Sequence, residues 1–416
     1  MARMAVSFRP LPVITSVQLH PMDRWLACRL AETIAPARIR LELWNGWASP
    51  SVESPIGVLV VRDRRALIGL IVDPDLYFGE CYMSQRVEIL GDLEGVMRGL
   101  SGLRRPSQPS WRQKFALWAT PSNGFVSARR NVHHHYDLGN DFYATWLDPE
   151  LVYTCAYYPR RDASLEEAQA TKLDLVCRKL RLRPGERVVE AGCGWGALSL
   201  HMARHYGVGV TAFNISHEQI QYARGRASRE GLDGRVTFVE DDYRNITGQF
   251  DAFVSVGMLE HVGRRNYMAL GRVLRRSLRP DTGRGLLHFI GRDHPRLLNA
   301  WIRRRIFPGA YPPTIAEVMA SVLEPADLSV IDVENLRLHY ARTLEHWRGR
   351  FEAAHDAVRQ RFGEAFYRAW RLYLAGSEAA FATGWMQLFQ VVFAPAGGRV
   401  ADLGRPARRP RSAPTV

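Results

Sequence analysis

The feature that most constrains the fold is the regular alternation of short apolar segments and amphipathic helical segments between residues 164 and 290. The apolar segments have the length and the β-branched composition of buried strands. They are Arg187–Glu190, Val208–Asn214, Val236–Glu240, Phe250–Val256 and Gly285–Ile290. The helical segments are Leu165–Leu180, which follows a capping-box sequence at Ser164, and Ala197–His205, His217–Glu230 and Tyr267–Leu278. Strands and helices that alternate at this spacing predict an α/β fold with a doubly wound, mostly parallel sheet.

The first predicted strand leads into a glycine-rich loop, Glu190–Gly196, with glycines at positions 192, 194 and 196. Glycines let the backbone turn sharply and come close to a ligand. The spacing differs from the G-x-G-x-x-G pattern of dinucleotide-binding proteins, and the second strand ends in Asn214 rather than in an acid that binds the NAD ribose. The loop therefore favours a different cofactor, although a βα turn without a ligand stays open.

Polar residues stand at the ends of several predicted strands. Parallel sheets of this type bind ligands beyond the carboxyl ends of their strands. That edge would carry the glycine loop together with Asn214, Asp241, Glu260 and His288. A buried acid and a satisfied core histidine are the structural alternatives for Glu260 and His288.

The charge of the chain indicates an anionic partner. The sequence has 56 Lys and Arg against 42 Asp and Glu, a formal net charge of +14, and only three of the basic residues are lysines. Guanidinium groups bind phosphate, so nucleic acid and an anionic membrane surface both fit, as does a compositional bias of the source. The basic residues are spread along the chain instead of gathered with aromatic residues, which argues against nucleic acid.

The five cysteines are far apart and form no CxxC pair, so we expect neither a disulfide framework nor a metal site. No apolar run approaches the ~18 residues that a membrane-spanning helix needs, and we expect no secretion signal. These observations together favour the reducing cytoplasm.

Composition also suggests how the chain is divided. Residues 1–104 are expected to form a small α/β domain, with strands at Ile39–Trp44 and Gly57–Val61 and a helix near Ser84–Leu100. A linker and lead-in would follow at 105–130, the main domain at 131–396, and a disordered tail at 397–416.

Several longer motifs then identify a family. The loop Glu190–Gly196 is similar to motif I of S-adenosylmethionine-dependent methyltransferases. The chain further resembles cyclopropane-fatty-acyl-phospholipid synthases and the related mycolic acid methyltransferases from about residue 131 to 395. The segments that carry this resemblance are Asn131–Tyr143, Leu151–Tyr157, Ser255–Gly263, Leu287–Gly291, Ile306–Tyr311 and Leu338–Trp347.

The resemblance implies a definite chemistry. A methyl group would pass from the sulfonium of S-adenosylmethionine to the cis double bond of an unsaturated acyl chain, and loss of one proton from the added methyl would close a cyclopropane. The site must exclude water that would quench the cationic intermediate, yet it must present a base. In this family a bound bicarbonate is that base.

The resemblance also implies the site residues, position by position. The bicarbonate pocket would consist of Cys155, Glu260, His288, Tyr340 and the backbone of Ile290. The cofactor would be bound by Tyr153, Thr154, Glu190, Gly192, Gly194, Trp195, Gly196, Asn214, Ser216, Gln219 and Asp241. Asp242 is an alternative to Asp241 for the adenine amine.

The implied partners are unsaturated phospholipid acyl chains and an anionic membrane surface, with the protein peripheral on the cytoplasmic face of the membrane. A homodimer is compatible with the resemblance. A helical cap insert, about residues 291–370, would roof the acyl pocket. Within it, Trp301–Phe307 fits either a membrane-contacting segment or a cap helix with a solvated arginine face.

Two local features leave alternatives open. Ser377 stands where family members typically have a cysteine, which weakens the choice of a cyclopropane over a methyl-branched or methylene product. N-methylation of a small amine, as in related plant enzymes, is a further alternative. His133–His135 could suggest a metal, but adjacent residues do not converge on one ion, and we expect a structural or substrate-proximal role.

Overall fold

The computed structural model describes residues 19–103 and 138–398. The predicted linker at 105–130, His133–His135 and the tail beyond residue 398 lie outside the described residues. The chain divides into two compact units, one formed by Met1–Arg105 and Phe362–Leu372, the other by Pro106–Arg361 and Tyr373–Val416.

The first unit contains a three-stranded sheet. Strand β1 (Ile39–Leu43) pairs in parallel with β2 (Gly57–Val61), and β2 pairs antiparallel with β3 (Val87–Gly91). Four helices accompany the sheet, α1 (Pro21–Ile34), α2 (Arg64–Val72), α3 (Pro74–Met83) and α4 (Leu93–Leu103).

The helix predicted near Ser84–Leu100 is confirmed only for its second half, because β3 occupies Val87–Gly91 and α4 begins at Leu93. The apolar residues of Val87–Gly91 are too few to separate a buried strand from a helical turn by periodicity alone. Their partner is β2, which is buried along its whole length.

The second unit is a seven-stranded sheet with the order β6-β5-β4-β7-β8-β10-β9. The central strands β4 (Arg187–Ala191), β5 (Gly209–Asn214), β6 (Val236–Glu240), β7 (Ala252–Val256) and β8 (Arg284–Gly291) are parallel. Strand β10 (Gln387–Pro395) runs antiparallel between β8 and β9 (Leu328–Asn335). The predicted α/β fold with a mostly parallel sheet is confirmed.

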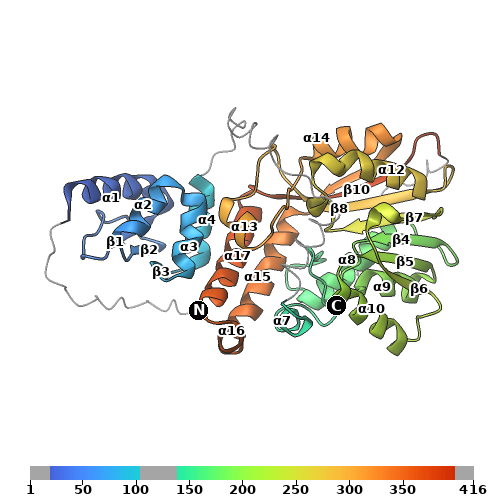
Figure 1. The fold of residues 1–416 in the computed structure, drawn as a ribbon, viewed down its shortest axis with the longest axis horizontal. Coiled ribbons are helices and arrows are strands. Elements are labelled where there is room, and N and C mark those ends of the chain that lie inside the picture. The colour runs from blue at the N-terminus through green and yellow to red at the C-terminus, as the bar shows by residue number, and fades with distance from the viewer. Residues whose placement is uncertain (1–18, 104–137, 399–416) are drawn as a thin grey trace, which may run out of the picture. The chain divides into compact units, whose positions relative to one another are not determined.

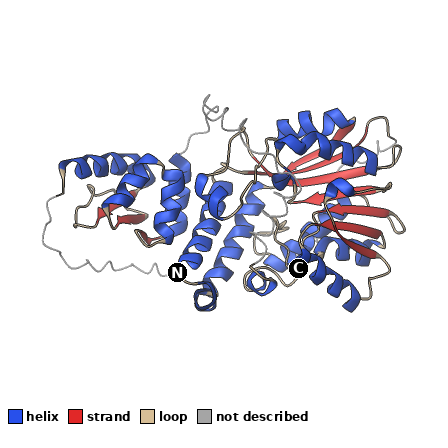
Figure 2. Cartoon of the chain, viewed as in Figure 1, coloured by secondary structure: helices blue, strands red, loops and turns tan. Residues whose placement is uncertain are grey.

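Helices cover both faces of this sheet (Figures 1 and 2). The helices described from residue 138 onward are α7 (Asn140–Ala144), α8 (Leu165–Lys179), α9 (Ala197–Tyr206), α10 (His217–Arg229), α11 (Leu259–Val262), α12 (Tyr267–Ser277), α13 (Ala300–Arg305), α14 (Ile315–Val318), α15 (Arg337–Ala353), α16 (His355–Phe362) and α17 (Glu364–Ala382). The last of these crosses the boundary between the two units.

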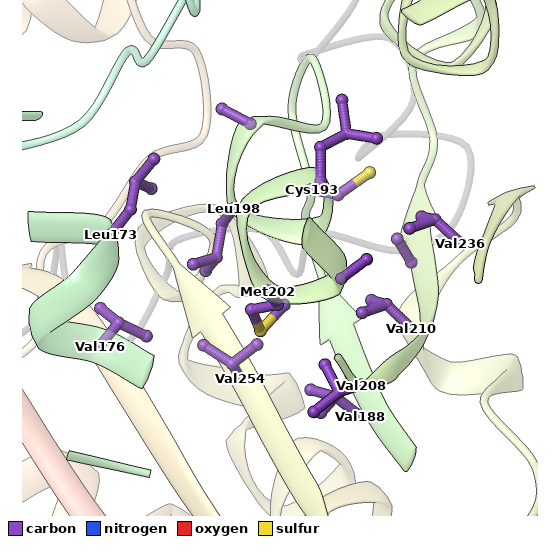
Figure 3. Close-up of a cluster of buried hydrophobic side chains, with 14 of the residues drawn as sticks. Leu173, Val176, Val188, Cys193, Leu198, Met202, Val208, Val210, Val236 and Val254 are labelled. Atoms are coloured by element: carbon purple, nitrogen blue, oxygen red, sulfur yellow. The ribbon is translucent and has the colours of Figure 1, made fainter. Parts of the chain in front are cut away.

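Alternate residues of each central strand belong to two separate cores. Val188 packs with residues of α8, α9 and α10, whereas Val189 packs with residues of α11 and α12 on the other face. Figure 3 shows the first core, in which Leu173, Leu198 and Met202 lie against the strands. This alternation matters for the site, because it fixes which face each polar strand residue occupies.

The five predicted strands are all present, with ends that shift by two residues at most. Strands β9 and β10 were not predicted. Strand β9 lies inside the range 291–370, so this segment is not purely helical and extends the sheet at its edge.

Candidate active site

The glycine loop after β4 has a left-handed backbone at each of its three glycines. A Cβ atom added at Gly192 would lie 3.0 Å from Met258 Cβ, and one added at Gly196 would lie 2.7 Å from Phe238 Cζ. At Gly194, with φ +54°, an added Cβ would meet no protein atom within 4 Å. Packing of the protein against itself therefore explains two of the glycines, while Gly194 faces space that a ligand can occupy.

Residues from β5 and α10 surround the same loop. Asn214 Nδ2 donates to Gln219 Oε1 at 2.8 Å and to the carbonyl of Gly194 at 3.4 Å. Ser216, the N-cap of α10, accepts a hydrogen bond from the Gln219 backbone N–H. The structure thus brings Gly194, Asn214, Ser216 and Gln219 together, as a cofactor site would require.

The two candidate acids after β6 have different surroundings. Asp242 is buried and binds Arg244 through both carboxylate oxygens, at 2.7 and 2.8 Å. Asp241 is half-buried, and its Oδ1 accepts from the Asp242 backbone N–H and from Asn245. Asp242 is committed to a structural ion pair, which leaves Asp241 as the better candidate for a ligand contact.

A buried polar cluster lies on the α8 face of the sheet and joins two cofactor candidates. Glu190 accepts a hydrogen bond from Ser199, and burial raises its pKa to about 7. Lys172 on α8 is 2% exposed and donates to Thr154 Oγ1 at 2.9 Å. Burial lowers the pKa of Lys172 to about 8, while the nearby groups of Asp148, Cys155 and Glu190 act in the opposite direction and raise it.

Aromatic side chains enclose the predicted cofactor residues Tyr153 and Trp195. The Tyr153 hydroxyl lies 2.8 Å from that of Tyr373, and its ring packs 5.2 Å from Trp347. Trp195 donates from Nε1 to Asn140 Oδ1 at 2.7 Å, and its ring lies 5.0 Å from that of Tyr143. The Trp195 side chain thus anchors the glycine loop to α7.

Glu260 follows β7 and is only 4% exposed. Its Oε1 accepts a hydrogen bond from the backbone N–H of Ile290, so the structure joins two of the predicted catalytic residues. Its Oε2 is buried and has no hydrogen-bond partner among the described residues. Burial raises the pKa of Glu260 to about 7, opposed by the Ile290 N–H.

His288 lies on β8, two residues before Ile290, and is 2% exposed. Its Nδ1 lies 3.0 Å from Gln390 Nε2, and its Nε2 is buried without a hydrogen-bond partner in the part of the chain that the structure describes. Burial, together with the charges of Lys172 and Lys179, holds the pKa of His288 well below its usual range. The imidazole is therefore neutral at physiological pH.

Cys155 and Tyr340 both approach the carbonyl of Leu336, at the start of α15. The Cys155 thiol is fully buried and lies 3.9 Å from the carbonyl of Leu336, the same carbonyl that accepts the backbone N–H of Tyr340. The Tyr340 ring packs against Phe381 with centroids 4.5 Å apart. Burial raises the pKa of the Cys155 thiol, so it stays protonated and serves as a weak donor.

Sequence patterns alone missed Lys172, Asp148 and Gln390, which are all buried. Lys172 is one of only three lysines in the chain, and it lies on the helix α8 among apolar residues. A lysine on the apolar face of a helix was the one sequence feature that could have identified it. Gln390 gave no signal, because its strand had not been predicted.

The family model described as Mycolic acid cyclopropane synthetase matches residues 125–391, more than half of the chain. A probable fatty acid methyltransferase of Pseudomonas putida is 36% identical over 369 residues, 85% of this chain and 91% of that protein. The cyclopropane-fatty-acyl-phospholipid synthase of Escherichia coli strain K12 is 43% identical over 260 residues, 62% of this chain and 66% of that protein.

A solved structure shares the fold of the second unit. The crystal structure of mycolic acid cyclopropane synthase CmaA1, complexed with SAH and CTAB, is 31% identical in sequence and superposes with a TM-score of 0.60. It covers 64% of this chain and 97% of its own length. Among the described residues, no helix combines the length and the apolar character needed to cross a bilayer.

Proposed function

The chain belongs to the mycolic acid cyclopropane synthetase family, and we propose that it acts on the cis double bonds of unsaturated phospholipid acyl chains. It is an S-adenosylmethionine-dependent methyltransferase that forms cyclopropane fatty acyl chains. The observation that carries the proposal is a pair of buried polar atoms without a hydrogen-bond partner among the described residues, Glu260 Oε2 in α11 and His288 Nε2 on β8. Ring closure needs a proton acceptor in a dry site, and these atoms supply the polar groups such an acceptor requires.

The residues around Gly194 fit S-adenosylmethionine. The space above Gly194 allows close approach to the backbone, and Asn214, Gln219 and Asp241 supply polar groups from neighbouring strand ends. When bound, the cofactor supplies the methyl group. Beneath the loop, on the α8 face of the sheet, the buried carboxylate of Glu190 and the buried ammonium group of Lys172 offset each other's charge.

The residues near β8 fit a small anion such as bicarbonate, which would supply the base when bound. The neutral His288 can donate from Nε2, whereas the single thiol proton of Cys155 is donated to the carbonyl of Ala156. Glu260 Oε2 requires a donor, which a protonated oxygen of the anion provides. The Ile290 N–H, assigned to the anion by family resemblance, donates to Glu260 and so would act by orienting that carboxylate.

Exclusion of water is the second contribution of the protein. Cys155, Tyr340 and Phe381 are almost entirely buried, and Tyr153 is enclosed by aromatic rings. A site without bulk water protects a cationic intermediate from hydration and strengthens hydrogen bonds to charged groups.

We also propose a peripheral position on the cytoplasmic face of the membrane. Arg303, Arg304 and Arg305 on α13 are exposed, whereas Trp301 and Ile306 are buried. The arginines can bind lipid phosphates, but the buried aromatic and aliphatic residues cannot enter the bilayer in this conformation. The five cysteines are unpaired thiols, which supports a reducing compartment.

Mass spectrometry of phospholipids from a host that expresses the protein tests the proposed function. We expect acyl chains heavier by one CH2 group that resist ozonolysis, because a cyclopropane has no double bond. Acyl chains of the same increased mass that ozone does cleave would indicate a methylene product. Acyl chains heavier by two further hydrogen atoms would indicate a methyl branch. Unchanged lipids in a host with active protein would contradict the proposal and favour a small amine as substrate.

A further inference from the structure

Gln390 on β10 and His288 on β8 lie directly opposite each other in the sheet. The two strands are neighbours (Figure 1). Both are buried, with Gln390 0% and His288 2% exposed. The Gln390 amide nitrogen lies 3.0 Å from His288 Nδ1, within hydrogen-bond distance. The side chains therefore form a buried pair that two strands hold in register.

This contact decides which ring nitrogen carries the proton. An amide nitrogen is a donor only, so it requires Nδ1 to be the acceptor. A neutral imidazole that accepts at Nδ1 has its proton on Nε2. The Nε2–H is then the donor that His288 directs away from Gln390.

The charged groups that face His288 from neighbouring elements favour the neutral ring. Lys172 and Lys179 on α8 are buried and oppose a positive charge on the imidazole. Asp332 and Glu334 on β9 bind Lys179, at 3.5 and 2.7 Å, and Glu334 lies opposite Gln390 in the sheet. The acids on β9 thus pair with the lysine, and the ring keeps a single proton.

Gln390 is an unusual residue for its position. Strand β10 is buried at all nine positions, and the neighbours of Gln390 are Phe389 and Val391. Burial of an amide is unfavourable unless it is hydrogen-bonded, and the Gln390 Oε1 has no partner among the described residues. An apolar residue would suit the core better, so the benefit of the amide lies in its contact with His288.

We propose that Gln390 is a positioning residue, which holds the His288 ring with its proton on Nε2 and so provides a donor for the anionic base. This inference rests on the proposed function for the role of His288, but the protonation pattern can be measured without turnover. Gln390 acts through His288 and is not assigned a contact with substrate.

Nitrogen-15 NMR of the histidine-labelled full chain tests the protonation pattern. The chain has 13 histidines, and the His288→Gln variant identifies the signals of His288 by their loss. We expect Nδ1 at the frequency of an unprotonated nitrogen and Nε2 at that of a protonated one. A wild-type spectrum with the proton on Nδ1 would overturn the proposal, whatever any variant does.

The Gln390→Glu variant tests the consequence for catalysis. A carboxylate accepts from Nδ1–H, so we expect the Nδ1 signal to become that of a protonated nitrogen. Turnover should fall about 10- to 100-fold, as for other residues that orient a functional histidine, while the Kd for S-adenosylmethionine stays within about twofold. Gln387→Glu, the same change three residues earlier on β10, should leave the His288 signals unchanged.

The outcomes separate the two proposals. Normal turnover in Gln390→Glu with Nδ1 protonated would contradict the positioning role. If the wild type makes no cyclopropane lipid, the proposed function fails while the NMR result still stands. Should Gln390→Glu not fold, Gln390→Met removes the donor without adding charge, and an unchanged Nδ1 frequency there would also refute the contact.

Discussion

Glu260 is the residue whose surroundings bear most directly on the reaction. One carboxylate oxygen is fixed by the backbone of β8, and the other is buried without a partner among the described residues. The carboxyl group of Glu260 therefore has a fixed orientation, and its negative charge is poorly solvated. Both properties suit a residue that binds or exchanges a proton with a small acceptor beside it.

We expect Glu260→Gln to reduce turnover by about 100-fold or more, because an amide cannot take up a proton. Its affinity for S-adenosylmethionine should be nearly unchanged, since Glu260 makes none of the contacts around Gly194. Product analysis by mass spectrometry and calorimetric titration with the cofactor measure the two effects. Glu218→Gln, at an exposed position of α10, is the control. Normal turnover in Glu260→Gln would remove this residue from the mechanism.

At the scale of elements, the glycine loop and the strand ends define the cofactor site. The loop requires left-handed backbone at Gly194, where the protein itself places no atom near the missing Cβ. Gly231, in the turn after α10, has a similar φ of +66° and equally open surroundings.

We expect Gly194→Val to abolish binding of S-adenosylmethionine, because the side chain would fill the space that the cofactor needs. Gly231→Val should suffer a comparable strain of about 1–3 kcal/mol but retain cofactor binding. Calorimetric titration of both variants measures cofactor binding, and thermal unfolding measures the loss of stability that backbone strain causes. Undiminished cofactor binding by Gly194→Val would refute the assignment of the loop.

The sequence predicted those elements whose signals are local. Strands β4 to β8 have short apolar runs bounded by helices, and the glycine loop marks the first crossover. Strand β9 was missed because Ser329, Asp332 and Glu334 divide its apolar residues, and β10 because its continuous apolar run follows a long helix. The contact between Gln390 and His288 depends on the pairing of β10 with β8, which no local pattern specifies.

The same limit applies to the site. Family resemblance placed Glu260, His288 and Ile290 near one another, and the structure joins Glu260 to Ile290 by a hydrogen bond. It could not place Lys172, whose role depends on the tertiary packing of α8 beside Thr154 and Glu190.

The stability of the whole molecule should reflect the buried carboxyl groups. The folded-state pKa of Glu260, about 7, lies above its ordinary value of 4.5, so the folded chain holds this proton more tightly than the unfolded chain. Its contribution to stability is therefore complete below pH 4.5 and is lost as the pH rises towards 7. Burial also raises the pKa of Asp148 to about 6 and that of Glu190 to about 7, so these two groups also lower the stability of the folded chain as the pH rises.

We expect Glu260→Gln to be more stable than the wild type at pH 8, by up to about 3 kcal/mol, because glutamine resembles the protonated acid. The difference should shrink as the pH falls from 7 and vanish near pH 4.5. Urea unfolding of both proteins at a series of pH values measures it. A constant difference across this range would show that Glu260 does not titrate between these values.

The position of helix α17 limits where this protein can be truncated. Residues Phe362–Leu372, which include most of its first half, belong to the compact unit built from Met1–Arg105. There the buried Arg368 guanidinium donates to the carbonyls of Tyr82 and Val87 and pairs with Glu88. A truncated version that lacks Met1–Arg105 would leave the buried guanidinium of Arg368 without these acceptors. Expression trials should therefore keep the N-terminal region, even where only the methyl-transfer chemistry is of interest.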